Sequence, residues 1–364
     1  MPRIRLENIV KRFGTVAAAD DLSLTVNDGE YLCILGPTGA GKTTCMRIIC
    51  GLTDPDSGHV YFDDRDVTRL EVNMREATML SQVYSLFPQM NVYENVMFGP
   101  LIKEWDEESS RQMVKNIFHM VHMEERVNAY PNELSGGQQQ RIALARALAS
   151  GSKILLLDEP LRALDARLRL ELRKELRSMV KEMGLTAVHV THDQEEALEM
   201  ADRIAVIRDG RIIQVGTPKE VFEEPKTPFV ANFVGRSNMI EGVIASAEGD
   251  VATVTGNGGT VFKARYTDRA VGSKVLVAVK IGNTKISLTE DGYFKGRIER
   301  KLYEGATITV EVNVPDIGTV SVKLPNRKFD DFEIDDEVSV NWSPEKAFVF
   351  DYPENGLEDE LRVD

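Results

Sequence analysis

Short apolar runs alternate with segments of helical periodicity from about residue 4 to residue 233. Four of the runs have the length and composition of buried strands: residues 31–35, 154–157, 187–191 and 204–208. Leu, Arg, Glu and Lys recur at helical spacing in residues 161–183. Alternation of buried strands with helices predicts an α/β domain with a largely parallel central sheet. The helix-rich pattern of residues 88–150 predicts a helical subdomain inserted into it.

The pattern changes after residue 235. Short alternating runs broken by Gly, Asn and Asp are typical of strands joined by tight turns. Here they are residues 251–254, 274–279, 307–312 and 338–342. They predict a second, all-β domain over residues 236–352, a small barrel or sandwich, after an N-terminal domain of residues 1–235. The tail, residues 353–364, is acidic with few apolar side chains, so we expect it to remain mobile.

Length and composition are compatible with two globular domains, because 364 residues exceed the size at which one core keeps growing. No apolar run approaches the roughly 20 residues that span a bilayer, and the first residues do not resemble a secretion signal. We therefore expect a cytoplasmic protein that reaches any membrane through a partner. The net charge of −14 disfavours broad nucleic-acid binding. The spacing of Cys33, Cys45 and Cys50 indicates core packing rather than a metal or disulfide site.

A glycine-rich loop follows the apolar run at residues 31–35 and precedes a helical pattern at residues 43–50. Glycines let the backbone fold tightly enough for several N–H groups to point at one phosphate chain, while a lysine and the helix start add positive charge. The loop is therefore predicted to be a P-loop that binds a nucleoside triphosphate. Its residues are Gly36, Pro37, Thr38, Gly39, Ala40, Gly41, Lys42, Thr43 and Thr44.

Two carboxylates, Asp158 and Glu159, end the buried run at residues 154–157. We expect Asp158 to serve Mg²⁺ together with Thr43 and the β- and γ-phosphates, because magnesium prefers oxygen ligands and keeps several waters. At the end of a strand, the Glu159 carboxylate can turn toward the γ-phosphate and polarise a water. By itself, the pair is also compatible with a solvated acidic turn.

A second segment of small residues, 134–141, precedes a helical run at residues 142–149. Backbone N–H groups at such a helix start make a second phosphate-binding surface. Because the chain has one P-loop and one such segment, the economical arrangement is a head-to-tail homodimer with each ATP between the P-loop of one copy and the segment of the other. The residues concerned are Ser135, Gly136, Gly137 and Gln138.

These motifs, in this order, resemble an ATP-binding cassette (ABC) ATPase, whose LSGGQ signature is unaltered at residues 134–138. The resemblance implies that Phe13 is the aromatic for adenine and that Gln82 lies in the loop that senses the γ-phosphate and the metal. It also implies that Glu159 is the general base and that His192 contacts the γ-phosphate.

The same resemblance implies a role for each of the two surfaces between which one ATP is expected to bind. Lys42 neutralises phosphate charge in its own subunit, and the signature residues Ser135, Gly137 and Gln138 act across the dimer. Leu164 and Asp165 belong to the loop through which the two copies contact each other.

The whole length of the chain is similar to the ATPases of bacterial and archaeal solute importers. In that group the β-rich tail holds paired OB-like folds, the TOBE domain, and residues 337–345 resemble its closing strand. Tyr84, Leu86 and Phe87 resemble the surface that receives a short cytoplasmic helix of a membrane permease. The resemblance implies two permease subunits, an indirect extracytoplasmic solute-binding protein, and a peripheral position on the cytoplasmic face of the membrane.

Three positions depart from the family pattern. Arg162 stands where the dimer-contact loop usually has a small residue, and Ser81 where an aromatic commonly precedes the glutamine. Arg162 either alters subunit contacts or is simply solvated, and we favour the latter. Lys280 begins a segment that lacks the Arg-Pro-Glu usual in these tails, which puts any inherited regulatory contact in doubt. His119 and His122 are interpreted as surface or packing residues.

The junction at residues 229–240 resembles polyamine, ferric-ion and related importers more than many sugar importers. We therefore expect a polyamine, ferric ion or related small solute, with a sugar as the alternative. A soluble ABC ATPase of nucleic-acid or translation machinery is the alternative of another class. It is disfavoured because the chain has a single cassette, a β-rich tail and an acidic balance. A nucleotide-gated scaffold without turnover is disfavoured because Glu159 and His192 are both present.

Overall fold

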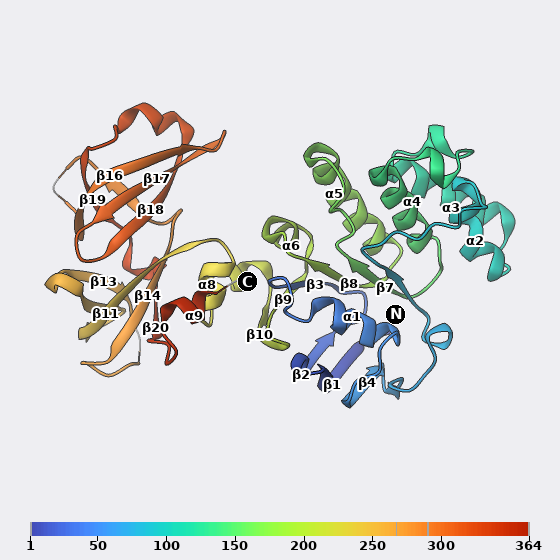
Figure 1. Cartoon of the computed structure of the whole chain (residues 1–364), viewed down its shortest axis with the longest axis horizontal. Coiled ribbons are helices and arrows are strands. Elements are labelled where there is room, and N and C mark those ends of the chain that lie inside the picture. The colour runs from blue at the N-terminus through green and yellow to red at the C-terminus, as the bar shows by residue number, and fades with distance from the viewer. Residues whose placement is uncertain (1, 267, 290, 363–364) are drawn as a thin grey trace. The chain divides into compact units, whose positions relative to one another are not determined.

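A computed structural model describes residues 2–266, 268–289 and 291–362. The chain divides into two compact units between Val221 and Phe222 (Figure 1). This division lies upstream of the boundary expected at residue 235. Residues 222–235 group with the second unit because helix α8 (Pro228–Phe233) packs on that unit's strand β14 (Lys274–Lys280).

The first unit contains a six-stranded sheet in the order β10-β9-β3-β8-β7-β6. All neighbours are parallel except β10, which pairs antiparallel with β9. β3, β7 and β8 are buried along their whole length, as parallel strands covered on both faces must be. The predicted α/β class and the four strand predictions are confirmed. The strands are β3 (Tyr31–Leu35), β6 (Ala77–Leu80), β7 (Ile154–Asp158), β8 (Thr186–Thr191), β9 (Arg203–Arg208) and β10 (Arg211–Gly216).

Three helices connect or flank these strands: α1 (Lys42–Cys50), α5 (Ala166–Glu182) and α6 (Gln194–Met200). Helix α5 begins five residues later than its helical pattern suggested. The delay has a local cause, because the Asp165 side chain accepts a hydrogen bond from the backbone N–H of Leu168 and so caps the helix. Residues 161–165 are therefore free to form a loop.

An antiparallel sheet at the N-terminus was not predicted separately. It has the order β2-β1-β4-β5. Its apolar side chains, such as Ile4 and Leu6, share one core with Ile34 and Leu156 of the parallel sheet. The strands are β1 (Ile4–Phe13), β2 (Val16–Val26), β4 (Ser57–Phe62) and β5 (Arg65–Asp66).

The predicted helix-rich insertion consists of α2 (Val92–Ile102), α3 (Glu107–Met120) and α4 (Gly136–Leu148). Each begins at a side chain that accepts a backbone N–H, namely Asn91, Asp106 and Ser135. The signature segment thus forms the first turn of α4, so the helix begins six residues earlier than its pattern suggested. Short 3-10 turns lie nearby at η1 (Val72–Met74), η2 (Glu124–Arg126) and η3 (Pro131–Glu133).

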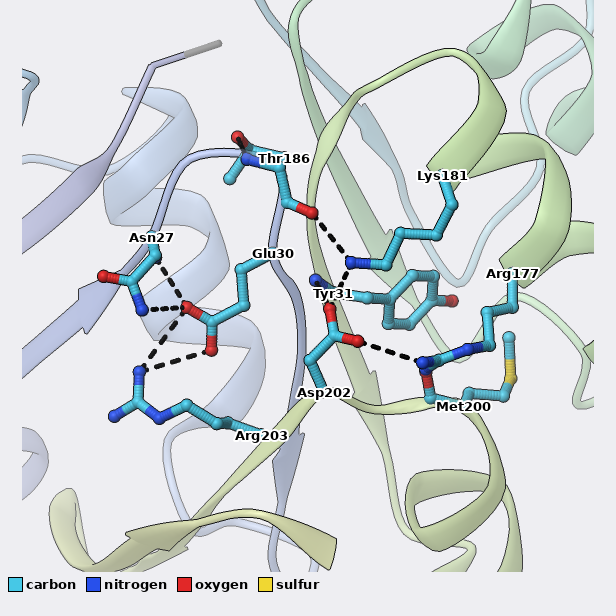
Figure 2. Close-up of polar contacts among 10 residues, drawn as sticks. Asn27, Glu30, Tyr31, Arg177, Lys181, Thr186, Met200, Asp202 and Arg203 are labelled. Atoms are coloured by element: carbon cyan, nitrogen blue, oxygen red, sulfur yellow. Dashed lines mark hydrogen bonds and ion pairs between the residues drawn. The ribbon is translucent and has the colours of Figure 1, made fainter.

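Ion pairs hold the end of α5 against the starts of β3 and β9 (Figure 2). Asp202 accepts Arg177 Nη2 at 2.9 Å and the backbone N–H of Tyr31 at 2.8 Å, and it also pairs with Lys181. Beside it, Glu30 pairs with Arg203 at 3.2 Å. These contacts occupy the edge where the parallel strands begin. Ligands of such sheets bind at the opposite edge, where the strands end. That edge is therefore where we expect the nucleotide.

Two five-stranded antiparallel sheets form most of the second unit, in the orders β13-β12-β11-β14-β20 and β15-β19-β16-β17-β18. Side chains from both sheets, including Ile240, Phe262, Val310 and Trp342, share one hydrophobic core. The prediction of a C-terminal all-β domain is confirmed. Its strands are β11 (Ser237–Glu248), β12 (Val251–Gly256), β13 (Val261–Arg265), β14, β15 (Lys285–Ser287), β16 (Phe294–Tyr303), β17 (Thr307–Val314), β18 (Gly318–Pro325), β19 (Glu337–Asn341) and β20 (Ala347–Asp351).

Helical turns complete the chain. Helix α9 (Leu357–Leu361) lies within the acidic tail and packs on α8, where Glu360 Oε1 accepts the backbone N–H of Phe229 at 3.3 Å. The expectation of a mobile tail therefore does not hold for these residues. The remaining turns are α7 (Pro218–Glu223), η4 (Asn257–Gly259), η5 (Asn326–Asp331) and η6 (Pro344–Lys346). Within the described residues, no helix is long and apolar enough to cross a bilayer.

Candidate functional site

The glycine-rich loop lies between β3 and α1, as predicted. Lys42 is 7% exposed, and its Nζ donates to the carbonyl oxygens of Gly36 at 2.8 Å and Pro37 at 2.7 Å. Gly41 has φ 98° at the start of α1, and a Cβ there would overlap the carbonyl oxygen of Ala18. Only glycine combines this backbone with this close approach. The loop therefore wraps around an ammonium group at a helix N-terminus, an arrangement suited to phosphate.

Beside the loop, Thr43 and Asp158 meet through a hydrogen bond from Thr43 Oγ1 to Asp158 Oδ2 at 3.0 Å. Burial raises the pKa of Asp158, while the Thr43 hydroxyl acts against this rise. Burial also lowers the pKa of Lys42, and the carboxylates of Glu159 and Asp158 oppose that shift. The hydroxyl and the carboxylate are oxygen ligands of the kind that Mg²⁺ prefers. They fit a magnesium ion that takes its other ligands from phosphate and water.

Glu159 follows β7 in a left-handed backbone conformation, with φ 50°. Its side chain is only 9% exposed, and its Oε1 lies 3.1 Å from Nδ1 of His192. Its Oε2 accepts Nη1 of Arg162 at 2.9 Å. Arg162, 64% exposed, is thus not simply solvated as we favoured, because its guanidinium is bound to this carboxylate.

The register of the parallel sheet brings these groups together. Leu35 of β3 pairs with Thr191 of β8, and Asp158 of β7 pairs with Val190 of β8. The residues that follow the three strands therefore gather at one edge of the sheet. They are the P-loop, Glu159 and His192, three segments that lie far apart in the sequence.

A buried polar network beneath His192 was not anticipated. Tyr31 Oη lies 3.0 Å from Nδ1 of His189, and burial lowers the pKa of that histidine. Arg173, on α5, binds Asp193 at 2.6 Å, and Asp193 in turn caps α6. The network fixes the backbone on both sides of His192. Its members are ordinary polar residues whose roles depend on tertiary contacts, so the sequence pattern gave no signal.

The signature residues build the start of α4. Ser135 N donates to Gln138 Oε1 at 2.9 Å, and Gln138 N donates back to Ser135 Oγ at 3.4 Å. Gly137 faces the backbone of Ala163, where a Cβ would lie 3.3 Å from its carbonyl oxygen. Over the described residues, no hydrogen bond joins residues 134–138 to the P-loop of the same chain. The P-loop and the signature segment are thus not hydrogen-bonded to each other within the described part of the subunit.

Gln140, on α4, is a residue that the sequence analysis missed. It is 1% exposed, and its amide donates to the Glu159 carbonyl at 3.2 Å and accepts the Ala163 N–H at 3.0 Å. It therefore fixes both ends of the turn that carries Arg162. In the loop that follows, Leu164 is 6% exposed, which leaves little of its side chain for a second chain, whereas Asp165 is exposed.

The loop at residues 84–87 is held against the helical insertion. Tyr84, Leu86 and Phe87 are half-buried, and the Phe87 ring lies 4.5 Å from that of Phe98. Asn95, fully buried on α2, accepts the Phe87 N–H at 2.9 Å and donates to three carbonyl oxygens of residues 87, 90 and 91. This fixed apolar surface suits a docking helix.

Two further predicted residues are exposed. Phe13 ends β1 and is 55% exposed, as an aromatic that stacks on a base must be. Lys11 Nζ lies 5.7 Å from the centre of its ring. Gln82 lies exposed in the loop after β6 and is not hydrogen-bonded to Thr43 or Asp158. Its expected role beside the metal stays a prediction.

The histidines and cysteines agree with their interpretation. His119 and His122 are exposed, and His119 pairs with Glu124 at 2.7 Å. Cys33, Cys45 and Cys50 are buried and free. Burial raises the pKa of all three thiols, that of Cys45 to about 12.

Comparison with known proteins places this geometry in a family. The ABC transporter family matches residues 19–162, and the TOBE domain matches residues 274–350. The spermidine/putrescine import ATP-binding protein of Chromobacterium violaceum is 38% identical over 353 residues, covering 94% of this chain and 97% of that protein. The chain belongs to the ATP-binding subunits of ABC importers. The sulfate/thiosulfate import ATP-binding protein of Xanthomonas campestris is 47% identical over 253 residues, covering 68% of this chain and 74% of its own length.

A solved structure agrees with this assignment. A dimeric ATP-binding cassette in a post-hydrolysis state, bound to ADP and phosphate, superposes with a TM-score of 0.54 at 33% identity, covering 59% of this chain and 98% of its own. This importer subunit is therefore an ATPase with a C-terminal TOBE domain. The predicted family, fold class, ATP binding and importer function are confirmed.

Proposed function

We propose that this ATPase works as a homodimer that closes on two MgATP and thereby drives paired permease subunits between inward- and outward-facing states. The observation that carries the proposal is the position of Glu159. Its carboxylate lies at the end of β7, 3.1 Å from His192 and next to the Thr43–Asp158 pair. A general base must stand within reach of the water that attacks the γ-phosphate, and this edge of the sheet provides that position.

The roles of the other groups follow from their chemistry. Lys42 and the start of α1 would hold the β- and γ-phosphates, while Thr43, Asp158 and Gln82 would hold Mg²⁺. Magnesium would neutralise charge that develops on the phosphates. His192 stabilises the transferred phosphoryl group, and Phe13 stacks on adenine.

A composite site accounts for the separation of the P-loop from the signature segment. Ser135, Gly136, Gly137 and Gln138 present backbone N–H groups at the start of α4, a surface suited to the phosphates of an ATP bound by another copy. The exposed Asp165 lies in the loop expected to contact that copy. The dimeric form of the solved cassette supports this arrangement.

The surface of Tyr84, Leu86 and Phe87 is the proposed contact with the permease. Docking there would place the subunit on the cytoplasmic face of the membrane without a span of its own. The transported solute contacts the permease and an extracytoplasmic binding protein rather than this chain. The names of several relatives and the junction at residues 229–240 favour a polyamine. The similarity to the sulfate/thiosulfate protein makes another small solute the second candidate for the transported substrate.

Glu159→Gln tests the general base. The amide keeps the size of the side chain but cannot accept the proton, so ATP should still bind while turnover falls by about 10²- to 10⁴-fold. Steady-state phosphate release and nucleotide binding measure the two effects separately. Glu107→Gln, an exposed glutamate on α3, is the matched control and should turn over ATP normally. Normal turnover by the Glu159 variant would remove this residue from the role.

Mixing two inactive variants tests the composite site. Lys42→Ala damages the P-loop and Ser135→Arg blocks the signature surface, so each homodimer should be inactive. A mixed dimer contains one pocket with both defects and one with neither, so the mixture should recover ATPase activity. If each site were complete within one chain, mixing would restore nothing.

A further inference from the structure

Arg162 makes a contact for which the proposed mechanism has no use. Both oxygens of the Glu159 carboxylate are engaged, Oε1 with His192 at 3.1 Å and Oε2 with the Arg162 guanidinium at 2.9 Å. A carboxylate bound to a guanidinium on one side and to a histidine on the other is held in one orientation. With both oxygens engaged, the carboxylate is not free to turn toward an attacking water.

The backbone around this pair is fixed. Gln140 bonds the Glu159 carbonyl at 3.2 Å and the Ala163 N–H at 3.0 Å, and the Arg162 N–H donates to the Glu159 carbonyl at 3.3 Å. This turn places the Arg162 side chain over the Glu159 side chain. Release of the carboxylate therefore requires rotation of a side chain rather than rearrangement of the loop.

Exposure decides which side chain moves. The Glu159 side chain is 9% exposed, whereas that of Arg162 is 64% exposed and lies at the surface of the subunit. A cavity of about 80 Å³ borders both residues and is lined further by Arg169, His192 and Asp193. It provides room for water beside Glu159 once the guanidinium leaves.

We propose that Arg162 is a latch that holds Glu159 in the resting subunit and is released when a second copy docks against residues 161–165. This proposal rests on the proposed function, since it assigns Glu159 to the base and that loop to the dimer contact. Arg162 acts through Glu159 and is a positioning residue. The latch keeps Glu159 bound in a single subunit, and its release on docking makes the base available in the closed dimer.

The size of the effect follows from the exposure of the pair. An ion pair with an exposed partner contributes little free energy, because water and salt screen it. Here the exposed partner is Arg162. Loss of the latch should therefore raise basal turnover by about two- to five-fold. The increase should shrink at high salt, where the pair is already weakened in the wild-type chain.

The experiment compares Arg162→Ser, Arg162→Lys and the wild-type chain in steady-state ATPase assays over a range of subunit concentrations. Arg162→Ser should raise turnover by about two- to five-fold with KM for ATP unchanged, most clearly at low subunit concentration, where docking of a second copy limits turnover. Arg162→Lys keeps the charge and should stay near wild type. Arg111→Ser removes an exposed arginine from a comparable pair with Glu107 and should change nothing.

Other outcomes are equally decisive. Unchanged or lower turnover in Arg162→Ser would overturn the latch, and so would an equal increase in Arg162→Lys and Arg162→Ser. Glu159→Gln, assayed in parallel, separates this result from the proposed function. If that variant loses turnover while Arg162→Ser behaves as wild type, only the latch fails; if it keeps turnover, the assignment of the base fails.

Discussion

Lys280 illustrates how one residue acquires a local role in place of an inherited one. It departs from the Arg-Pro-Glu of similar tails, and its side chain is buried within the second unit. Its Nζ donates to the Val234 carbonyl at 2.6 Å and lies 4.3 Å from the centre of the Phe222 ring. The residue therefore ties the chain after α8 to β14 instead of facing a regulator.

Burial of this ammonium predicts a pH dependence of stability. Burial lowers the pKa of Lys280 from 10.5 to about 8. Between these two pH values the unfolded chain binds more protons than the folded chain, so stability should rise with pH, by at most about 3 kcal/mol. Urea unfolding of a Trp105→Phe chain, followed through the buried Trp342, reports on the second unit.

The matched variant for this measurement is Lys280→Met, which keeps the length of the side chain without the charge. It should lose most of the rise between pH 8 and 10.5. An identical rise in both proteins would assign the effect to other titrating groups.

At the residue scale, sequence alone predicted the groups whose chemistry depends on local spacing. The P-loop, Asp158, Glu159 and the signature are short contiguous patterns. The sheet brings the first three together, while the signature lies at the start of α4. Gln140 and Arg173 were missed because their partners lie far along the chain, and Asn95 because its partners are backbone groups of an irregular loop. Buried amides and guanidinium groups of this kind cannot be distinguished from surface ones by composition.

At the scale of elements, α4 connects two functional surfaces. Its first turn carries the signature, and near its end Arg146 donates to the Ser85 carbonyl at 2.7 Å and lies 4.8 Å from the centre of the Phe87 ring. One helix therefore touches both the surface proposed for ATP and the loop proposed for the permease. A displacement of α4 on closure would be transmitted directly to that loop.

Asn95 determines how firmly the loop is held. Asn95→Ala removes four hydrogen bonds and takes this partner from the half-buried Phe87 N–H and Met90 carbonyl, so we expect a local loss of about 1–3 kcal/mol. Hydrogen exchange should accelerate at residues 84–91, while ATPase activity of the isolated subunit stays close to normal. Stimulation of that activity by the permease should fall.

Asn116→Ala is the control, because this asparagine is exposed on α3 with a single side-chain hydrogen bond to Gln112. Its exchange pattern at residues 84–91 should match the wild type. Unaltered protection in Asn95→Ala would mean that ring packing alone holds the loop.

Helices and strands were predicted best where the hydrophobic pattern alone determines their ends. Buried strands β3, β7, β8 and β9 are continuous apolar runs, and their ends were located to within one residue. The starts of α4 and α5 were misplaced because capping side chains, not periodicity, set where those helices begin. The antiparallel sheet β2-β1-β4-β5 was missed because its strands, joined through turns and long connections, have mixed exposure.

At the scale of the whole molecule, all three cysteines lie in the first unit, around the nucleotide site. Cys33 is in β3, and Cys45 and Cys50 are in α1.

The domain boundary was harder to predict than these positions, because residues 222–235 have helical patterns like those before them. Their membership of the second unit depends on the packing of α8 against β14, β11 and α9.

The buried thiols predict slow labelling of the folded chain. Because only the accessible thiolate reacts readily, Ellman's reagent at pH 8 should modify all three cysteines at once in guanidinium chloride but only slowly in buffer. MgATP should slow the reaction further, since a ligand of the folded state suppresses opening. Immediate modification of one thiol in buffer would contradict the burial of that side chain.

The position of these sulfur atoms has a consequence for control by oxidants. Sulfenylation and glutathionylation need a thiolate within reach of the reagent, and around the P-loop the fold offers none. Peroxide at signalling concentrations should therefore leave catalysis intact, and purified material should keep its activity without a reductant. Redox signals would have to regulate uptake through the permease, the solute receptor or gene expression.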